Sequence, residues 1–380
     1  MATILALVMA LGLTATVWAA DVSGSTSTKA AKIGGTEYDT LQAAINAASD
    51  GGNTVVLLKD LTESITIDNN KNVTIDLNGH KLTNTDGQHT ITNNGTLTIT
   101  ATNGGTVDNV THQRAAIVNN GTATLNGGTY TRSKENADNN KEDAKGNSFY
   151  TILSDNGATM TINEGVTVTN VGHFSSMIRN GGTSASTSTM IINGGTFNGG
   201  LNAIKNDEAG VLTINGGDFS NTSQFVVMNW HKTTINGGSF KAQPSAEAVL
   251  FTAKYAENTA VGELTIINGT FERSSDTQKM IRDYYDEDNK GTAAISGGAF
   301  KDATGKAVDV SAYLVAGKQQ NSDGSVGNKS YYYYPSTSDT TTSTTTKGSP
   351  KTFDAGIAVY VGMALTSAAG VAFVGKKRED

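Results

Sequence analysis

Three basic residues occupy the same position of a short recurring segment, and each lies close to acidic residues. Arg179, Lys205 and Arg282 all follow an isoleucine and precede an asparagine or aspartate. The neighbouring carboxylates are Asp155, Asp207 and Asp283. A row of cations flanked by carboxylates can bind an anionic sugar through charge-assisted hydrogen bonds, and the same pattern is also typical of a solvated face. We expect the three side chains to form a stripe, with sugar binding as the specific hypothesis and a solvated face as the alternative.

Two aromatic segments offer a second kind of chemistry, the stacking of a sugar ring on an aromatic face. Trp230 and His231 replace a short turn, and Trp230 is one of 2 tryptophans in the chain. Tyr284 and Tyr285 lie in an insertion, residues 282–288 (RDYYDED), that mixes aromatic and acidic side chains. Insertions in repeat proteins often gather on the binding face. These segments are therefore candidate glycan-binding residues, with simple packing as the alternative.

A catalytic or metal-binding set is much harder to find. Asp86, within residues 84–87 (NTDG), is a weak candidate for a catalytic carboxylate. Inverting sugar hydrolysis uses two carboxyl groups roughly 6.5–9.5 Å apart, and Asp86 has no evident partner, so we expect an ordinary turn there. The 5 histidines show no metal-ligand spacing, and the chain has no cysteine. We expect no cofactor and no metal; a calcium ion is conceivable near the carboxylates, although no residue pattern supports it.

The candidate binding residues lie in or beside one repeated segment, in which aliphatic residues precede an Asn-Gly-Gly turn and an aromatic residue. Clear copies are 190–197 (MIINGGTF), 212–219 (LTINGGDF) and 233–240 (TTINGGSF). Their central residues Ile192, Ile214 and Ile235 are 22 and 21 residues apart. Copies separated by insertions extend the series from Leu77 to Ile295.

One such unit cannot bury a core alone, but stacked copies can, because their inward aliphatic side chains form continuous columns. Alternation places Leu212 and Ile214 on the inner face, together with Phe219, and Thr213 on the outer face. The sequence therefore predicts an all-β, single-stranded parallel β-helix over residues 51–308, a solenoid of about nine or ten coils spaced by about 4.8 Å. A candidate side-chain amide ladder along one corner comprises Asn119, Asn180, Asn206 and Asn229.

The open ends of a β-helix expose unpaired backbone, which invites aggregation unless it is covered. Residues 39–49 (DTLQAAINAAS) place their aliphatic side chains on one helical face, with Asp39 or Thr40 as the N-cap. The expected segments at the two ends are an N-terminal linker at 21–35, a short capping helix at 36–50 and a C-terminal cap at 309–335.

The chain termini carry features typical of export and wall attachment. Residues 1–20 form an uncharged, apolar stretch that ends in small residues, which predicts a secretory signal peptide. A Ser/Thr-rich linker at 336–348 precedes residues 349–380, which hold a short motif, an apolar segment at 355–375 and a basic tail. At about 1.5 Å per residue, the apolar segment matches the thickness of a bilayer core. Membrane contact is expected only there, and only transiently.

This order resembles the cell-wall sorting signal of Gram-positive surface proteins, which has a Leu-Pro-x-Thr-Gly-like motif, a hydrophobic segment and a basic tail. The motif residues here are Ser349, Pro350, Lys351, Thr352 and Phe353. Pro350 and Thr352 match the motif, whereas Ser349 and Phe353 stand where Leu and Gly are usual. The resemblance implies that a sortase cleaves after Thr352 and joins it to peptidoglycan, so that the protein is extracellular and anchored to the wall of a Gram-positive bacterium.

The repeated INGGTF-like segments, with residues 54–61 (TVVLLKDL) and 73–82 (VTIDLNGHKL), are similar to pectin-lyase-like β-helix surface proteins of Gram-positive bacteria. The resemblance covers roughly residues 36–310 and implies a right-handed helix. That superfamily includes lyases, hydrolases, adhesins and binding scaffolds, so the resemblance does not determine the function. Residues 84–86 match the Asn-Thr-Asp motif of polygalacturonase-like enzymes, but their other motifs are absent from this sequence.

The net charge of −7 and the lack of a large basic cluster argue against nucleic-acid partners. Our leading hypothesis is a wall-anchored β-helix surface protein that acts by adhesion, or by contact with glycan or host protein, without catalysis. A polysaccharide lyase or glycoside hydrolase acting on uronate-type glycans is the first alternative, and a passive structural spacer is the second. Sortase and peptidoglycan are the expected partners in each case.

Overall fold

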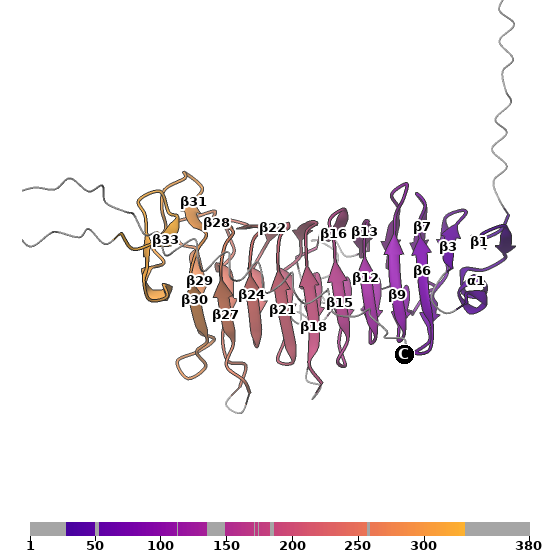
Figure 1. The fold of residues 1–380 in the computed structure, drawn as a ribbon, viewed down its shortest axis with the longest axis horizontal. Helices are drawn as coiled ribbons and strands as arrows, with labels where there is room; N and C mark the ends of the chain where they lie inside the picture. The colour runs from indigo at the N-terminus through magenta and orange to yellow at the C-terminus, as the bar shows by residue number, and fades with distance from the viewer. Residues whose placement is uncertain are drawn as a thin grey trace, which may run out of the picture. The chain divides into compact units, whose positions relative to one another are not determined.

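The computed structural model describes residues 28–49, 53–111, 113–134, 149–170, 172–173, 175–182, 186–256 and 259–330. The predicted signal peptide at 1–20, wall linker at 336–348 and sorting signal at 349–380 lie outside these residues. Within them, three long sheets are built from coils that stack along one axis (Figure 1). Each complete coil supplies one strand in turn to sheets A, B and C, and nearly all neighbouring strands are parallel. The predicted parallel β-helix is therefore confirmed.

Ten coils contribute to sheet B and nine to sheet C, which agrees with the expected number of coils. The coil strands of sheet A are β3 (Thr54–Leu57), β6 (Asn72–Asp76), β9 (Thr96–Thr100), β12 (Thr122–Leu125), β15 (Thr159–Ile162), β18 (Ser188–Ile192), β21 (Gly210–Ile214), β24 (Lys232–Ile235), β27 (Glu263–Ile266) and β30 (Thr292–Ile295). Those of sheet B are β4 (Leu61–Thr62), β7 (Lys81–Thr83), β10 (Thr106–Asp108), β13 (Gly128–Thr131), β16 (Val166–Asn170), β19 (Thr196–Gly199), β22 (Asp218–Thr222), β25 (Ser239–Ala242), β28 (Thr270–Arg273) and β31 (Ala299–Asp302). Those of sheet C are β5 (Ile65–Ile67), β8 (Ile91–Asn93), β11 (Ile117–Asn119), β14 (Ile152–Ser154), β17 (Ile178–Asn180), β20 (Asn202–Asn206), β23 (Phe225–Asn229), β26 (Ala248–Thr252) and β29 (Lys279–Arg282).

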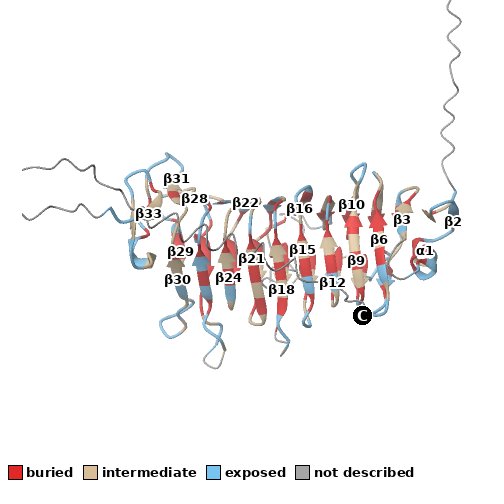
Figure 2. Ribbon diagram, viewed as in Figure 1, coloured by how far each residue is buried: buried red, intermediate tan, exposed pale blue. Residues whose placement is uncertain are grey.

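The interior is filled by columns of apolar side chains, one from each coil. Leu212 and Ile214 of β21 are buried, and Thr213 between them is only partly buried. Buried and less buried positions alternate along most strands in this way (Figure 2). Phe219 is also buried, but it lies on β22, beyond the Asn-Gly-Gly turn. The turn thus separates two strands, and the complete coil has three.

The phenylalanines of sheet B form an internal stack. Their ring centroids lie 4.4–4.9 Å apart, and the ring planes are within 9° of parallel. The members are Phe197, Phe219, Phe240, Phe271 and Phe300. Gly217 makes the turn before one of these rings with a φ of +115°, and a Cβ there would lie 3.2 Å from the Gly195 carbonyl oxygen. Glycine at this turn therefore allows the coils to approach closely enough for the rings to stack.

A buried asparagine ladder runs along one corner, as predicted. Asn180 donates to Asn206, and Asn206 donates to Asn229, with Nδ2–Oδ1 distances of 2.8 and 2.9 Å. Asn119 belongs to the same column, but it donates to the hydroxyl of Ser154, which stands between it and Asn180. These hydrogen bonds fix the register of neighbouring coils inside the core.

A second asparagine ladder lies on the surface. Its members come from the turns between sheets A and B and are Asn126, Asn163, Asn193, Asn215 and Asn236. Each amide donates to the preceding coil, whereas each amide of the buried ladder donates to the following one.

The N-terminal coil is covered by a helix and a hairpin. Helix α1 (Leu41–Ala47) buries its aliphatic face against the core, and Thr40 is its N-cap. Glu63, from the first coil, accepts hydrogen bonds from the first backbone N–H groups of the helix. The segments expected to be linker and helix also form an antiparallel hairpin, β1 (Ala31–Ile33) and β2 (Thr36–Tyr38), and β1 pairs with β3. The hairpin thereby satisfies backbone groups at the edge of sheet A.

The C-terminal end is covered by residues within the predicted cap. The 3₁₀ turn η1 (Ser311–Tyr313) precedes a hairpin of β32 (Lys318–Gln320) and β33 (Val326–Asn328). The backbone N–H groups of Val315 and Val326 donate to carbonyl oxygens of the last coil.

None of the helices in the described ranges is both long and apolar enough to cross a membrane. The apolar segment at 355–375 lies outside those ranges.

Candidate functional site

The register of sheet C aligns the three predicted basic residues in one row. Arg179 on β17 pairs with Lys205 on β20. Met228 and Phe251 occupy the next two positions, and Arg282 follows them. The stripe is therefore interrupted: two cations lie at one end, one lies at the other, and two apolar side chains separate them.

The N-terminal end of the row is an ion-pair network, which we call the Arg179 cluster (Asp155, Arg179, Lys205 and Asp207). Arg179 Nε lies 2.9 Å from Asp207 Oδ2, and Lys205 Nζ lies 3.1 Å from the same oxygen. Asp155, from the preceding coil, approaches the guanidinium to 3.8 Å. The Arg179 guanidinium also lies over the ring of Tyr150, 5.6 Å from its centroid. Burial raises the pKa of Tyr150, so its hydroxyl stays protonated.

The middle of the row is apolar, although it faces away from the interior. Strands β23 and β26 are buried along their whole length. A second hydrophobic cluster, which we call the outer aromatic cluster, comprises Phe225, Met228, Trp230, Ala248, Phe251 and Ala253. Trp230 is only 4% exposed and packs edge to face on Phe251, with the ring centroids 4.7 Å apart. Its indole Nε1 is buried and finds no hydrogen-bond acceptor among the described residues.

Two tyrosines form the rim of the outer aromatic cluster. The rings of Tyr255 and Tyr285 meet Trp230 edge to face, with centroid distances of 5.2 and 5.5 Å. Both remain largely open to solvent, at 48% and 56% exposure. The buried indole therefore holds two exposed rings in place, an arrangement that suits the stacking of a flat, partly apolar ligand.

Arg282 forms the C-terminal end of the row. Its guanidinium donates to the Glu247 carboxylate and to the carbonyl oxygens of Tyr284 and Tyr285. Lys279 Nζ donates to the Tyr284 hydroxyl at 2.8 Å. This hydrogen bond and the charge of Lys279 lower the pKa of Tyr284. The two neighbouring tyrosines thus differ: Tyr284 contacts cations, whereas Tyr285 contacts Trp230.

Two further predicted residues contribute to turns. His231 Nδ1 lies 3.0 Å from the carbonyl oxygen of Gly210, which connects its turn to the preceding coil. Asp86 is exposed after β7, and its carboxylate accepts a hydrogen bond from the Thr111 hydroxyl at 3.3 Å. Asn84 is buried and accepts a hydrogen bond from the backbone N–H of Val110. Residues 84–87 therefore have the contacts of a structural turn.

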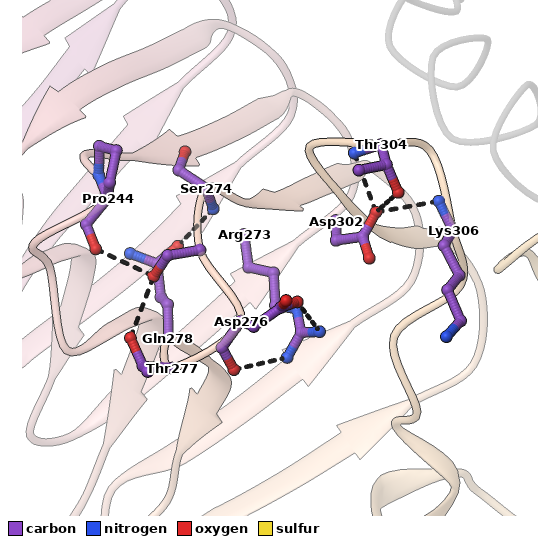
Figure 3. Close-up of polar contacts among 10 residues, drawn as sticks. Pro244, Arg273, Ser274, Asp276, Thr277, Gln278, Asp302, Thr304 and Lys306 are labelled. Carbon is purple, nitrogen blue, oxygen red and sulfur yellow. Dashed lines mark hydrogen bonds and ion pairs between the residues drawn. The ribbon is translucent and has the colours of Figure 1, made fainter.

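Another group of charged residues lies near the C-terminal end of sheet B (Figure 3). Arg273 Nη2 pairs with Asp276 at 3.0 Å. Asp302 accepts hydrogen bonds from the backbone N–H groups of Thr304 and Lys306, so it stabilises its own turn. These contacts are local and join residues of the same or neighbouring turns.

Among the described residues, no three histidine, aspartate or glutamate side chains are arranged so that they could hold a metal ion.

Sequence reasoning missed several members of the row. The sequence aligns Met228 with Arg179, because each lies between an aliphatic residue and an asparagine, but it does not mark Met228 as part of an apolar surface. Phe251 precedes threonine in place of asparagine, so it lacks part of this pattern. Tyr150 and Tyr255 lie outside the repeated segments, and only the folded chain brings them beside the row. Together the residues offer exposed rings next to hydrogen-bonding ion pairs, which is the chemistry needed to bind a hydroxyl-rich ring.

Comparisons with known protein families, with curated proteins and with solved structures found no match for the chain.

Proposed function

We propose that the chain is an exported surface protein, anchored to the wall of a Gram-positive bacterium, that binds glycan on the outer face of sheet C without catalysis. The observation that carries the binding proposal is the pair of exposed rings, Tyr255 and Tyr285, packed on the buried Trp230. The ion pairs at both ends of the row supply hydrogen-bond donors and acceptors for sugar hydroxyls. A ligand oxygen that reached the indole Nε1 would also satisfy a buried donor.

A glycan array probed with the purified full-length chain tests the binding proposal. We expect the wild-type chain to bind a defined subset of glycans, and the double variant Tyr255→Ala/Tyr285→Ala to lose that binding. Ile267→Ala is the matched control, because it removes an exposed side chain (48% exposed) from another corner of the coil. A wild-type chain that binds no glycan would favour the passive spacer, and binding that survives the double variant would contradict the proposed site.

The export and anchoring part of the proposal rests on the termini and on the resemblance to Gram-positive surface proteins. Thr352 is the residue that a sortase would join to peptidoglycan. We expect Thr352→Ala to move the protein from the wall fraction to the membrane or the medium, as measured by immunoblotting of cell fractions. Covalent attachment that persists in this variant would refute the motif assignment.

A polysaccharide lyase acting on uronate-type glycans is a second candidate, favoured by one observation. Tyr284, whose pKa is lowered, lies beside Lys279 and Arg282. Elimination from a uronate needs a base and a cation that offsets the carboxylate charge, and these three side chains provide such groups. Ultraviolet absorbance of unsaturated sugar products distinguishes the two candidates. Turnover that Tyr284→Phe abolishes would replace the binding proposal with the lyase.

A further inference from the structure

Three of the cations beside the outer aromatic cluster already have anionic partners, whereas the ammonium of Lys279 contacts the Tyr284 hydroxyl. Arg179 and Lys205 share Asp207, whose side chain is 5% exposed. Arg282 is paired with Glu247 at the other end of the row. A carboxylate ligand would therefore meet cations whose charge is already balanced, and displacing Asp207, the shielded partner, would be costly.

Acidic residues also surround these ion pairs. Glu208, next to Asp207, has a raised pKa, because burial and then the Asp207 charge disfavour its ionised form. The loop that carries Tyr285 adds Asp283, Asp286, Glu287 and Asp288 against a single Lys290. An additional negative charge at this surface would therefore meet repulsion from several carboxylates.

Paired ions remain good partners for hydroxyl groups. A carboxylate has about four acceptor sites and a guanidinium has five N–H donors, so an ion pair leaves sites of both kinds open. A sugar hydroxyl both donates and accepts, and it can use these sites without breaking the pair. The exposed faces of Tyr255 and Tyr285 bind the apolar face of a sugar whatever its charge.

Given the proposed glycan binding on sheet C, we infer that this site takes an uncharged polysaccharide and rejects uronate-rich ones. The matched ion pairs and the surrounding carboxylates determine the choice, and the two tyrosines provide the stacking surface. Because both tyrosine rings lie within 5.5 Å of the Trp230 ring, measured between centroids, they form one small patch suited to one or two sugar rings.

A pair of polymers that differ only in charge tests this inference. The full-length chain is titrated calorimetrically with a panel of uncharged glucans, mannans and galactans that have free primary hydroxyls, and with polygalacturonate and chitosan. The polymer that binds best is then oxidised at its primary hydroxyls to carboxylates and titrated again. We expect binding of an uncharged polymer, at least about tenfold weaker binding after oxidation, and little change of the uncharged binding with salt. Tyr285→Ala is expected to weaken the uncharged binding about tenfold, and Tyr285→Phe is expected to retain it.

The variant Glu208→Gln tests whether the charge of the surrounding carboxylates, and not only the shape of the site, excludes charged polymers. This variant removes one carboxylate and leaves both tyrosines, so we expect it to recover part of the binding of the oxidised polymer. Preferential binding of polygalacturonate, of the oxidised polymer or of chitosan would overturn the inference while leaving glycan binding in place. The absence of binding to every polymer would overturn the proposed function as well.

Discussion

The two asparagine ladders allow the contribution of a buried side-chain amide to be measured against a matched control in the same protein. Asn206 is fully buried, and its Nδ2 lies 2.9 Å from both Asn229 Oδ1 and the Gly210 carbonyl oxygen. Its Oδ1 accepts from Asn180 Nδ2 at 2.8 Å. Asn193 holds the equivalent central place in the exposed ladder, with ladder distances of 2.7 and 2.8 Å.

The variant Asn206→Ala removes both ladder hydrogen bonds where water cannot replace them. Asn180 Nδ2 keeps the Val211 carbonyl oxygen as a partner, and Asn229 Oδ1 keeps the Thr233 hydroxyl, so neither amide loses all of its partners. The remaining unsatisfied groups and the small cavity lead us to expect a loss of about 2–4 kcal/mol in the free energy of unfolding. For Asn193→Ala we expect a change of no more than about 0.5 kcal/mol, because water reaches the exposed groups.

Guanidinium unfolding of both variants, followed by circular dichroism and by Trp230 fluorescence, measures the difference. The slope of the free energy of unfolding against denaturant concentration should match that of the wild type, since neither substitution changes the surface exposed on unfolding by much. If both variants lost the same free energy of unfolding, or if Asn206→Ala were as stable as the wild type, burial would not determine how much these hydrogen bonds contribute to stability.

Two further predictions concern the core and the response to acid. Ile214→Asp places a charge at a fully buried position, and we expect loss of folding, seen as loss of the β-type circular dichroism spectrum; a thermal melt like that of the wild type would contradict this. The pKa of His89 is lowered from 6.5 by burial and by the charges of Arg114 and Arg132, so the unfolded chain binds the proton more readily. Stability should therefore be complete above about pH 6.5 and fall as the pH drops towards the folded pKa. We expect the unfolding midpoint of His89→Gln to change less with pH below about pH 6.5 than that of the wild type. An unchanged pH dependence would show that other groups cause the loss of stability in acid.

The parallel β-helix was predictable because its cause is repeated in the sequence. Ile192, Ile214 and Ile235 recur at nearly equal spacing, and the structure places them at successive positions of one sheet. The buried ladder was predictable for the same reason, since Asn180, Asn206 and Asn229 follow the same short segment. A repeat of this kind determines both which side chains point inward and which of them are neighbours.

The parts that were not predicted depend on segments that occur only once. The hairpin β1–β2 is short and partly charged, with Lys32 opposite Glu37, and it shows no hydrophobic alternation long enough to indicate a strand. Tyr255 reaches Trp230 from a different loop, and no spacing in the sequence relates the two residues. The candidate site therefore needed the fold before its members could be recognised together.

The regular register of the sheet A strands β18, β21 and β24 has a consequence for how such a chain can change in length. Residues 193–214 begin and end at equivalent points of two successive coils, where Ile192 pairs with Ile214. A gene duplication of this stretch would supply a new rung with its own turn asparagine, core aliphatics and stacking phenylalanine. The distance between the two caps would grow by one strand spacing, about 4.8 Å. The length of the solenoid can thus change by whole coils, while the residues of its two caps and of the tyrosine-rimmed patch stay the same.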